Sequence, residues 1–215
     1  MANGPEIYFI GGAPCGGKST AARAICSRHG FRAFELDKSL ERYTHLGMLE
    51  GNALLRAAAI AAPQDIDALP PCQQCKQELE IYRQLFPYAL RELRAMGPGA
   101  PILAEGAGFL PELMRRAGVD SRHYICLIPE PAFQRAHYRE RPWVAQLLAQ
   151  TPDPEQTFDR WMARNALLAR EICAQAQKQG YTCLTTNGAS TPEDTLRQAE
   201  AAAAFHCHGL RAKRK

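Results

Sequence analysis

The sequence contains no apolar stretch long enough to span a membrane. Residues 1–6 also lack the charged and then apolar pattern of a secretory signal peptide. We therefore expect a cytoplasmic protein with no membrane partner. No segment repeats along the chain and no linker of biased composition divides it. The 215 residues are enough to bury a full hydrophobic core as one domain, which is the economical interpretation.

The charge pattern also lacks a basic stripe with interleaved aromatic residues, which argues against a nucleic-acid partner. The net charge is only +4, and residues 211–215 carry part of it in a short basic tail. We interpret this tail as a solvated end of the chain. The small positive balance of the remaining residues suits an anionic small-molecule substrate.

The cysteines do not predict a disulfide framework, although there are eight of them. Most fall inside expected helices and strands, and a cytoplasmic protein keeps its thiols reduced, so we interpret them as free. Cys72 and Cys75 could instead bind zinc together with His206, Cys207 and His208. No second spaced cysteine pair supports this minor alternative.

The most informative stretch follows the apolar run 7–10 and precedes an expected helix. It matches the phosphate-loop pattern G-x-x-x-x-G-K-[ST]. Its glycines let backbone N–H groups turn toward a phosphate, and the helix adds the positive end of its dipole. The stretch therefore predicts binding of a nucleoside triphosphate. The expected contacts are Gly12, Ala13, Pro14, Cys15, Gly16, Gly17, Lys18, Ser19 and Thr20.

Two residues of this loop have expected roles beyond binding. Lys18 is placed to reach the β and γ phosphates, which makes it a candidate catalytic residue. The hydroxyl group of Ser19 is a candidate ligand of Mg²⁺. Cys15 occupies a variable position of the pattern, and we assign it no catalytic role.

Further candidates follow from the expected sheet. Five short runs are candidate strands and alternate with helical segments, which predicts a parallel sheet with helices on both faces. Ligands of such sheets bind beyond the carboxyl ends of the strands. Asp37, Glu105 and Asn187 follow the second, third and fifth runs, so we expect them at the edge that carries the phosphate loop.

The two carboxylates at this edge have different expected roles. Glu105 suits the acid that orders Mg²⁺, directly or through water, and the alternative is a surface glutamate at a strand end. Asp37 suits a catalytic base that takes the proton of a substrate hydroxyl group. It could instead cap the next helix or only hydrogen-bond to substrate hydroxyl groups.

Arginines gather on the expected helix near residue 135. Arg135 and Arg139 lie four residues apart on one helix face, and Arg141 follows them. Guanidinium groups neutralise the charge that phosphoryl transfer spreads over oxygen atoms. We therefore assign Arg139 and Arg141 to catalysis and Arg135 to nucleotide binding. Arg160 and Arg164 form a second such pair, and the alternative for either pair is a solvated helix face.

These stretches together resemble small-molecule kinases of the nucleoside monophosphate kinase-like group of P-loop proteins. That group includes adenylate, shikimate, gluconate and uridine kinases and chloramphenicol phosphotransferase. The resemblance rests on Gly12–Thr20, Asp37, Ile102–Gly106 and the arginines of 135–141. The chain also resembles bacterial proteins described as AAA family ATPases or predicted kinases, through residues 104–107, 110–111 and 141–143.

The resemblance implies a three-layer α/β/α P-loop NTPase fold with a five-stranded parallel sheet in the order 2-3-1-4-5. It implies one kinase domain over residues 1–210, with a helical acceptor-binding insertion at 38–96 and a lid at 134–160. It also implies that Asn187 lies beside the adenine. The chain lacks the Asp-x-Asp of a shikimate-type acceptor site, the Asn-Lys-x-Asp of a guanine site and the second cysteine pair of a zinc lid.

We therefore expect an ATP- and Mg²⁺-dependent phosphotransferase that acts on a hydroxyl group of a small-molecule acceptor, as a monomer or homodimer. Two alternatives stay open. One is a nucleotide-binding regulatory ATPase that signals through a protein partner, and the other is a toxin-like or nucleic-acid end kinase that uses the basic tail. Residues of the insertion that could recognise the acceptor are Arg42, Tyr43, His45, Arg56, Glu78, Tyr82 and Arg83.

Overall fold

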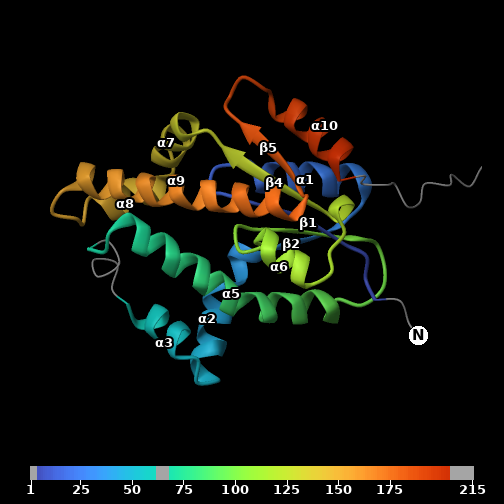
Figure 1. The fold of residues 1–215 in the computed structure, drawn as a ribbon, viewed down its shortest axis with the longest axis horizontal. Coiled ribbons are helices and arrows are strands. Elements are labelled where there is room, and N and C mark those ends of the chain that lie inside the picture. The colour runs from blue at the N-terminus through green and yellow to red at the C-terminus, as the bar shows by residue number, and fades with distance from the viewer. Residues whose placement is uncertain (1–3, 62–67, 204–215) are drawn as a thin grey trace, which may run out of the picture.

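The sheet has five parallel strands in the order β2-β3-β1-β4-β5, so the expected fold class is confirmed. The computed structural model describes residues 4–61 and 68–203 (Figure 1). The histidines and the third cysteine of the zinc alternative, and the basic tail, lie outside these residues. The strands are β1 (Ile7–Gly12), β2 (Arg32–Glu35), β3 (Ile102–Glu105), β4 (Tyr124–Pro129) and β5 (Thr182–Thr186).

Helices connect the strands and cover the sheet, as the alternation of candidate strands and helical segments predicted. They are α1 (Lys18–His29), α2 (Leu40–Leu49), α3 (Ala53–Ile60), α5 (Pro71–Ala95), α6 (Pro111–Arg116), α7 (Pro131–Arg139), α8 (Pro142–Leu148), α9 (Pro154–Gln179) and α10 (Pro192–Ala202). Two short 3-10 helices, η1 (Leu36–Ser39) and η2 (Ser121–His123), precede α2 and β4. None of the described helices is both long and apolar enough to cross a membrane.

Strand β1 shows how the sheet is held between two layers of helices. Successive side chains of a strand point to opposite faces. Tyr8 and Ile10 belong to the core beneath α1 and α10, whereas Phe9 belongs to the core beneath α5 and α9. Burying one such side chain fully contributes about 1.5–3 kcal/mol. The two cores therefore fix the sheet edge at which the functional loops emerge.

Helix α5 is one continuous element even though Pro87 lies inside it. Proline has no N–H group to donate to the carbonyl one turn earlier, and its ring pushes that carbonyl away. A proline inside a helix therefore kinks the helix or breaks it. Figure 1 shows the ribbon of α5 changing direction near its middle, so the kink is present and the division is absent.

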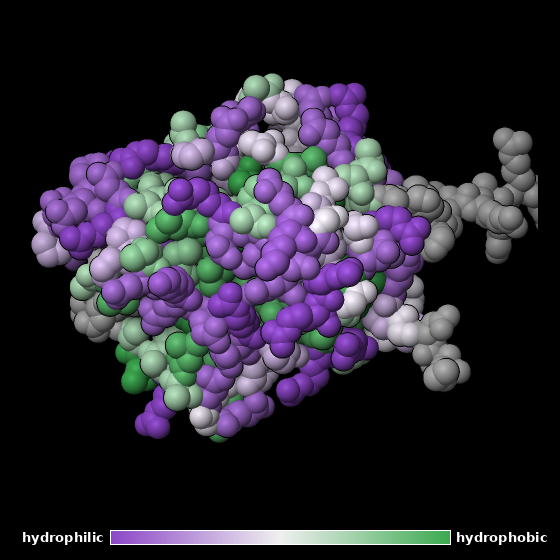
Figure 2. All heavy atoms as spheres, in the orientation of Figure 1, coloured by the Kyte–Doolittle hydropathy of each residue, from purple (hydrophilic) through white to green (hydrophobic). Residues whose placement is uncertain are grey.

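Two helical regions extend from the sheet at the same end of the molecule (Figure 1). Helices α2 and α3 pack against each other and against α5. Figure 2 shows hydrophobic residues gathering on this arm, where Leu49 and Ile60 are exposed. Helices α7, α8 and the start of α9 share a separate apolar cluster built on Tyr138, Phe158 and Trp161. This second region therefore has a small core of its own.

Candidate functional site

The loop between β1 and α1 has the geometry of a phosphate-binding loop. Gly12 has a φ of 124°, and a Cβ atom there would lie 2.1 Å from the Leu127 carbonyl oxygen. A Cβ atom on Gly16 would lie 2.4 Å from the same oxygen. The loop therefore needs glycine at both positions to pass under β4. Gly17, with a φ of 85°, is the N-cap residue of α1, whose first N–H groups have no partner within the helix.

Lys18 lies across the mouth of this loop. Its Nζ donates a hydrogen bond to the Ala13 carbonyl oxygen at 2.8 Å, and the residue is only 7% exposed. Burial lowers the pKa of Lys18, while the nearby charges of Asp37 and Glu105 raise it. Removing a buried ammonium group from water is costly unless anions lie close to it. A phosphate group inside the loop would provide such an anion.

Glu105 lies at the end of β3, directly behind the loop, and is only 2% exposed. Burial raises the pKa of Glu105, and the opposing influences are a hydrogen bond with the Ser19 side chain and the charge of Lys18. Among the described residues, one oxygen of the carboxyl group (Oε2) has no hydrogen-bond partner. The expectation that Glu105 follows a buried strand is confirmed, and its side chain is no surface acid.

These residues fit a magnesium ion. Mg²⁺ prefers oxygen ligands and is usually held by one or two carboxylates together with substrate phosphates, rather than by a cage of protein ligands. Ser19 and Glu105 supply a hydroxyl and a carboxylate oxygen, and the second oxygen of Glu105 lacks another partner. No cluster of three or more histidine, cysteine or acidic residues suited to a metal occurs in 4–61 and 68–203.

A cavity of about 1050 Å³ opens over the loop and joins elements from both halves of the chain. Pockets for one drug-sized ligand are roughly 300–1000 Å³, so this cavity is large enough for a nucleotide and a second small molecule. From the loop and α1 its lining takes Pro14, Cys15, Gly16, Gly17, Lys18, Ser19, Thr20, Ala21 and Arg23. Gly12 and Ala13 shape the loop from below and are not part of the lining.

Another wall of the cavity begins at Asp37, which lies in η1 just after β2. Its exposed carboxylate makes no hydrogen bond or ion pair with the described residues, and it is close enough to Lys18 to raise the pKa of that residue. The side chain does not cap α2, whose N-terminal residue is Leu40. Asp37 is thus free to accept a proton or a hydrogen bond from a ligand.

The arginines divide between this cavity and another face of the molecule. Arg135 and Arg139 are exposed, pair with Asp159 and Glu155 at 2.6 and 2.7 Å, and lie over the ring of Phe158. The structure therefore does not bring this predicted clamp pair to the phosphate loop. The reason is that these side chains already pair with the facing side of α9.

Two arginines from beyond the loop and α1, Arg141 and Arg164, also line the cavity. The guanidinium group of Arg141 lies against the rings of Tyr138 and Trp143 and forms a hydrogen bond with the Cys15 thiol. Burial raises the pKa of Cys15, and Arg141 opposes this rise. Arg141 is therefore brought together with the loop, as expected.

The other end of the cavity lies beyond β5. Here Gly188, Ala189, Ser190 and Thr191 line it, with Phe133 and His137 stacked at 3.9 Å between ring centroids. Asn187 is not part of the lining, because its side chain bonds to Glu130 and to the Ala189 amide and so shapes the loop. Thr186, which the sequence did not single out, lines the cavity with a buried hydroxyl group that has no partner in the described residues.

Gln134 is a second residue that sequence patterns did not indicate. It is only 2% exposed, and its Nε2 donates a hydrogen bond to the Pro14 carbonyl oxygen at 2.8 Å. This bond ties α7 directly to the phosphate loop. A lone glutamine in a helix gives no sequence signal, because only the tertiary fold brings it to residue 14.

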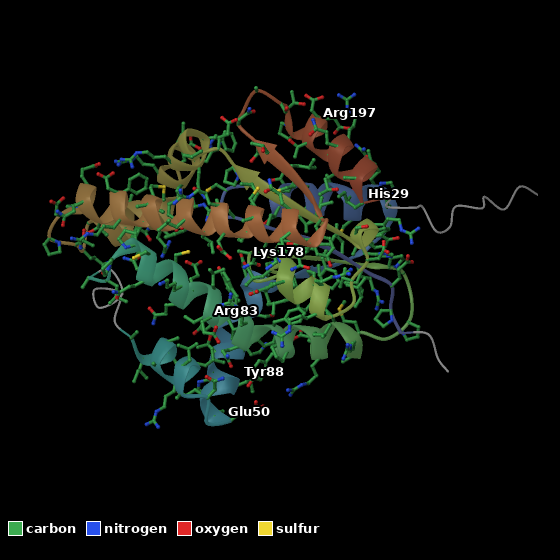
Figure 3. The ribbon with its side chains drawn as sticks, in the orientation of Figure 1. His29, Glu50, Arg83, Tyr88, Lys178 and Arg197 are labelled. Carbon is green, nitrogen blue, oxygen red and sulfur yellow. The ribbon has the colours of Figure 1, made fainter. Side chains whose placement is uncertain are left out.

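Most of the residues proposed to recognise an acceptor lie away from the cavity. Arg42 and Tyr43 both bond to Glu92. Arg83, which is labelled in Figure 3, pairs with Glu112 and Glu80. Figure 3 also shows Tyr88 beside Glu50, a contact that joins α5 to α2. Of the seven candidates of the insertion, the lining of the cavity contains Glu78 and Tyr82.

The sheet order and the loop after β1 define a three-layer α/β/α protein with the P-loop NTPase fold. No protein-family model and no curated protein matches the sequence. Several solved structures are similar to the chain. Shikimate kinase from Acinetobacter baumannii in complex with shikimate is 18% identical with a TM-score of 0.41, and the match covers 90% of this chain and 89% of that chain.

Two other solved structures are similar to the chain at the same level. The protein TT1252 from Thermus thermophilus is 16% identical with a TM-score of 0.49, with 93% of this chain and 98% of that chain covered. A kinase candidate from Chloroflexus aurantiacus is 12% identical with a TM-score of 0.44, with coverage of 94% and 97%.

Proposed function

We propose that the protein is an ATP- and Mg²⁺-dependent phosphotransferase that moves the γ-phosphoryl group to a hydroxyl group of a small molecule. One observation carries the proposal. A single cavity is lined at once by the phosphate loop and by Asp37, a carboxylate that makes no hydrogen bond or ion pair with the described residues. A nucleotide-binding switch needs the loop, but it does not need an open base-like carboxylate beside the place of the terminal phosphate.

The reaction balances with the groups present. The acceptor oxygen forms a bond to the γ-phosphorus while the bond from that phosphorus to the bridging oxygen breaks, and the electron pair stays on ADP. The hydroxyl proton passes to the carboxylate of Asp37. Lys18 and Arg141 neutralise charge on the phosphate oxygens. Ser19 and Glu105 would hold Mg²⁺, which supplies further neutralisation of the phosphate charge when bound.

The two ends of this cavity are proposed to bind different ligands. The end formed by Phe133, Thr186 and the loop after β5 is where we place the nucleotide base. The opposite end, where η1 and α5 of the insertion at 38–96 meet α9, is where we place the acceptor. Helices α7 and α8 with the start of α9 form the proposed lid over 134–160, because they share a core of their own.

Isothermal titration with a non-hydrolysable ATP analogue and Mg²⁺ tests the nucleotide half of the proposal. We expect the wild-type protein to bind and Lys18→Ala to bind about 10²-fold more weakly, because it loses a charge-assisted contact to phosphate. Lys38→Ala is the matched control, since Lys38 is exposed and pairs with Glu35 away from the cavity. Absence of binding by the wild type, or equal binding by Lys18→Ala, would refute the proposal.

A further inference from the structure

The acceptor end of the cavity has an unusual balance of charge. Its ionisable lining consists of Asp37, Glu78 and Arg164, whereas Lys18 and Arg141 lie at the phosphate loop. Two carboxylates therefore oppose one guanidinium group among the described residues at this end. The positive charge of the cavity lies where a triphosphate would bind, and the acceptor end is negative.

Arg164 does not offer a free guanidinium group. Its Nε lies 3.4 Å from Glu78 Oε2, and its Nε and Nη2 both donate to the Asn165 Oδ1 atom at 3.2 and 3.0 Å. Its side chain is only 18% exposed. The pKa of Arg164 is raised even though burial opposes this, because the charge of Glu78 stabilises the cation. An acidic acceptor would have to displace Glu78 to reach Arg164.

Hydrogen-bond acceptors are in excess at the same place. An ionised carboxylate only accepts, at about four lone-pair positions. Glu78 accepts a hydrogen bond from the Tyr82 hydroxyl group at 2.8 Å and forms an ion pair with Arg164, which leaves some of its lone pairs without a donor. Asp37 receives no hydrogen bond from the described residues. Such a surface favours a ligand that donates hydrogen bonds.

The remaining walls of this end are carbon-rich. Leu40 and Tyr82 line the cavity, and Tyr82 is only 9% exposed. Aromatic rings offer apolar contact area with a polar tip. A molecule with C–H groups on one side and several hydroxyl groups on the other would satisfy both kinds of wall.

We propose that the phosphate acceptor is a polyhydroxylated compound that carries no carboxylate or phosphate group, either neutral like a sugar or cyclitol or cationic like an amino sugar, with Asp37 and Glu78 receiving its hydroxyl groups. This inference rests on the proposed phosphotransferase function and adds the class of acceptor. In this arrangement Asp37 receives the reacting hydroxyl group, and Glu78 with Tyr82 holds a neighbouring one.

Transfer of labelled phosphate from ATP to a set of matched compounds tests the inference. The set contains neutral sugars and cyclitols, the corresponding amino sugars, and the corresponding uronic acids and sugar phosphates. We expect at least one neutral or cationic member to be phosphorylated, and its acidic counterpart to have a kcat/KM at least about 10²-fold lower. A best acceptor that is acidic, or no accepted member in a protein that binds ATP, overturns the inference. Failure to bind ATP overturns the proposed function instead.

A pair of variants separates recognition from folding. Glu78→Gln should leave the affinity for the ATP analogue within about twofold and lower kcat/KM for the accepted compound about 10- to 10²-fold. It should also reduce the preference over the acidic counterpart at least about tenfold, because Arg164 loses its neutralising partner. Glu80 lies on the same helix but bonds to Arg83 and Gln84. Glu80→Gln should therefore change neither kcat/KM nor the preference over the acidic counterpart. Equal behaviour of the two variants overturns the assignment of Glu78.

Discussion

Replacing Glu105 by glutamine tests the magnesium role of this site while keeping the shape of the side chain. Glu105 is almost completely buried, and burial raises the pKa of its carboxyl group. Because the pKa is higher in the folded protein than the value of about 4.3 in the unfolded chain, the protonated carboxyl group contributes to folding stability at low pH. This contribution is lost as the pH rises through the pKa of the folded protein. At neutral pH the buried carboxylate therefore costs stability. We expect Glu105→Gln to stabilise the nucleotide-free protein by about 1 kcal/mol, or roughly 2–4 °C in Tm.

The same substitution should reduce the additional stabilisation that magnesium gives to the nucleotide-bound protein. A ligand at 100 times its Kd stabilises a folded protein by about 2.7 kcal/mol. For a chain of this length that raises Tm by roughly 5–11 °C. In the wild type we expect such a shift with a non-hydrolysable ATP analogue and Mg²⁺, and a smaller one with the analogue and a chelator. In Glu105→Gln the difference between the two shifts should shrink, because the metal has lost its carboxylate ligand and keeps only the Ser19 hydroxyl group and the phosphates.

Differential scanning fluorimetry at neutral pH measures both effects. Glu35→Gln is the matched control, because Glu35 is the register partner of Glu105 on β2 but pairs with Lys38 outside the cavity. It should retain the magnesium-dependent shift. The stability gain from Glu105→Gln should also shrink as the pH falls toward about 4, where the wild-type carboxyl group is protonated. A less stable variant, or one that keeps the full magnesium-dependent shift, would show that the reasoning is wrong.

Two further substitutions test the transfer step. Asp37→Asn should leave the affinity for the ATP analogue unchanged and lower turnover about 10²-fold or more, and full activity in steady-state assays would eliminate Asp37 as the base. Arg141→Ala should lower kcat about 10²–10³-fold, because it removes a cation from the phosphate side of the cavity. Arg139→Ala should stay within about twofold, since Arg139 pairs with exposed Glu155, and an equal loss in both arginine variants would contradict the geometry.

Local sequence patterns were sufficient to predict the phosphate-loop edge of the site. The phosphate loop is a contiguous motif. Asp37 follows the short strand β2 and Glu105 ends β3, and the carboxyl ends of both strands must lie at the same edge of a parallel sheet. Both inferences need only the chain near the residue and the direction of the strands. The strand order came from the family resemblance, because nothing in a single strand says which neighbour it will pair with.

The acceptor end could not be predicted in this way. Glu78, Tyr82 and Arg164 come from two long helices, α5 and α9, that pack side by side. Their sequences show which residues are charged but not which turn of one helix faces the other. Arg42 and Tyr43 are equally plausible by residue type, yet both bond to Glu92 instead. The crossing of the two helices therefore decides which candidates meet the cavity.

Helix α7 shows how a correct pattern can indicate the wrong face. The spacing of four residues places Arg135 and Arg139 on one side of the helix, and it places Gln134 and Tyr138 together on a neighbouring side about 100° away. Tyr138 has the larger apolar surface, so burying its ring stabilises the protein more than holding two arginines at the loop. Gln134 is buried beside it and bonds to Pro14. Once this pair faces inward, the arginines must face Glu155 and Asp159. Arg141 can turn back to the loop because it lies just beyond the last residue of α7.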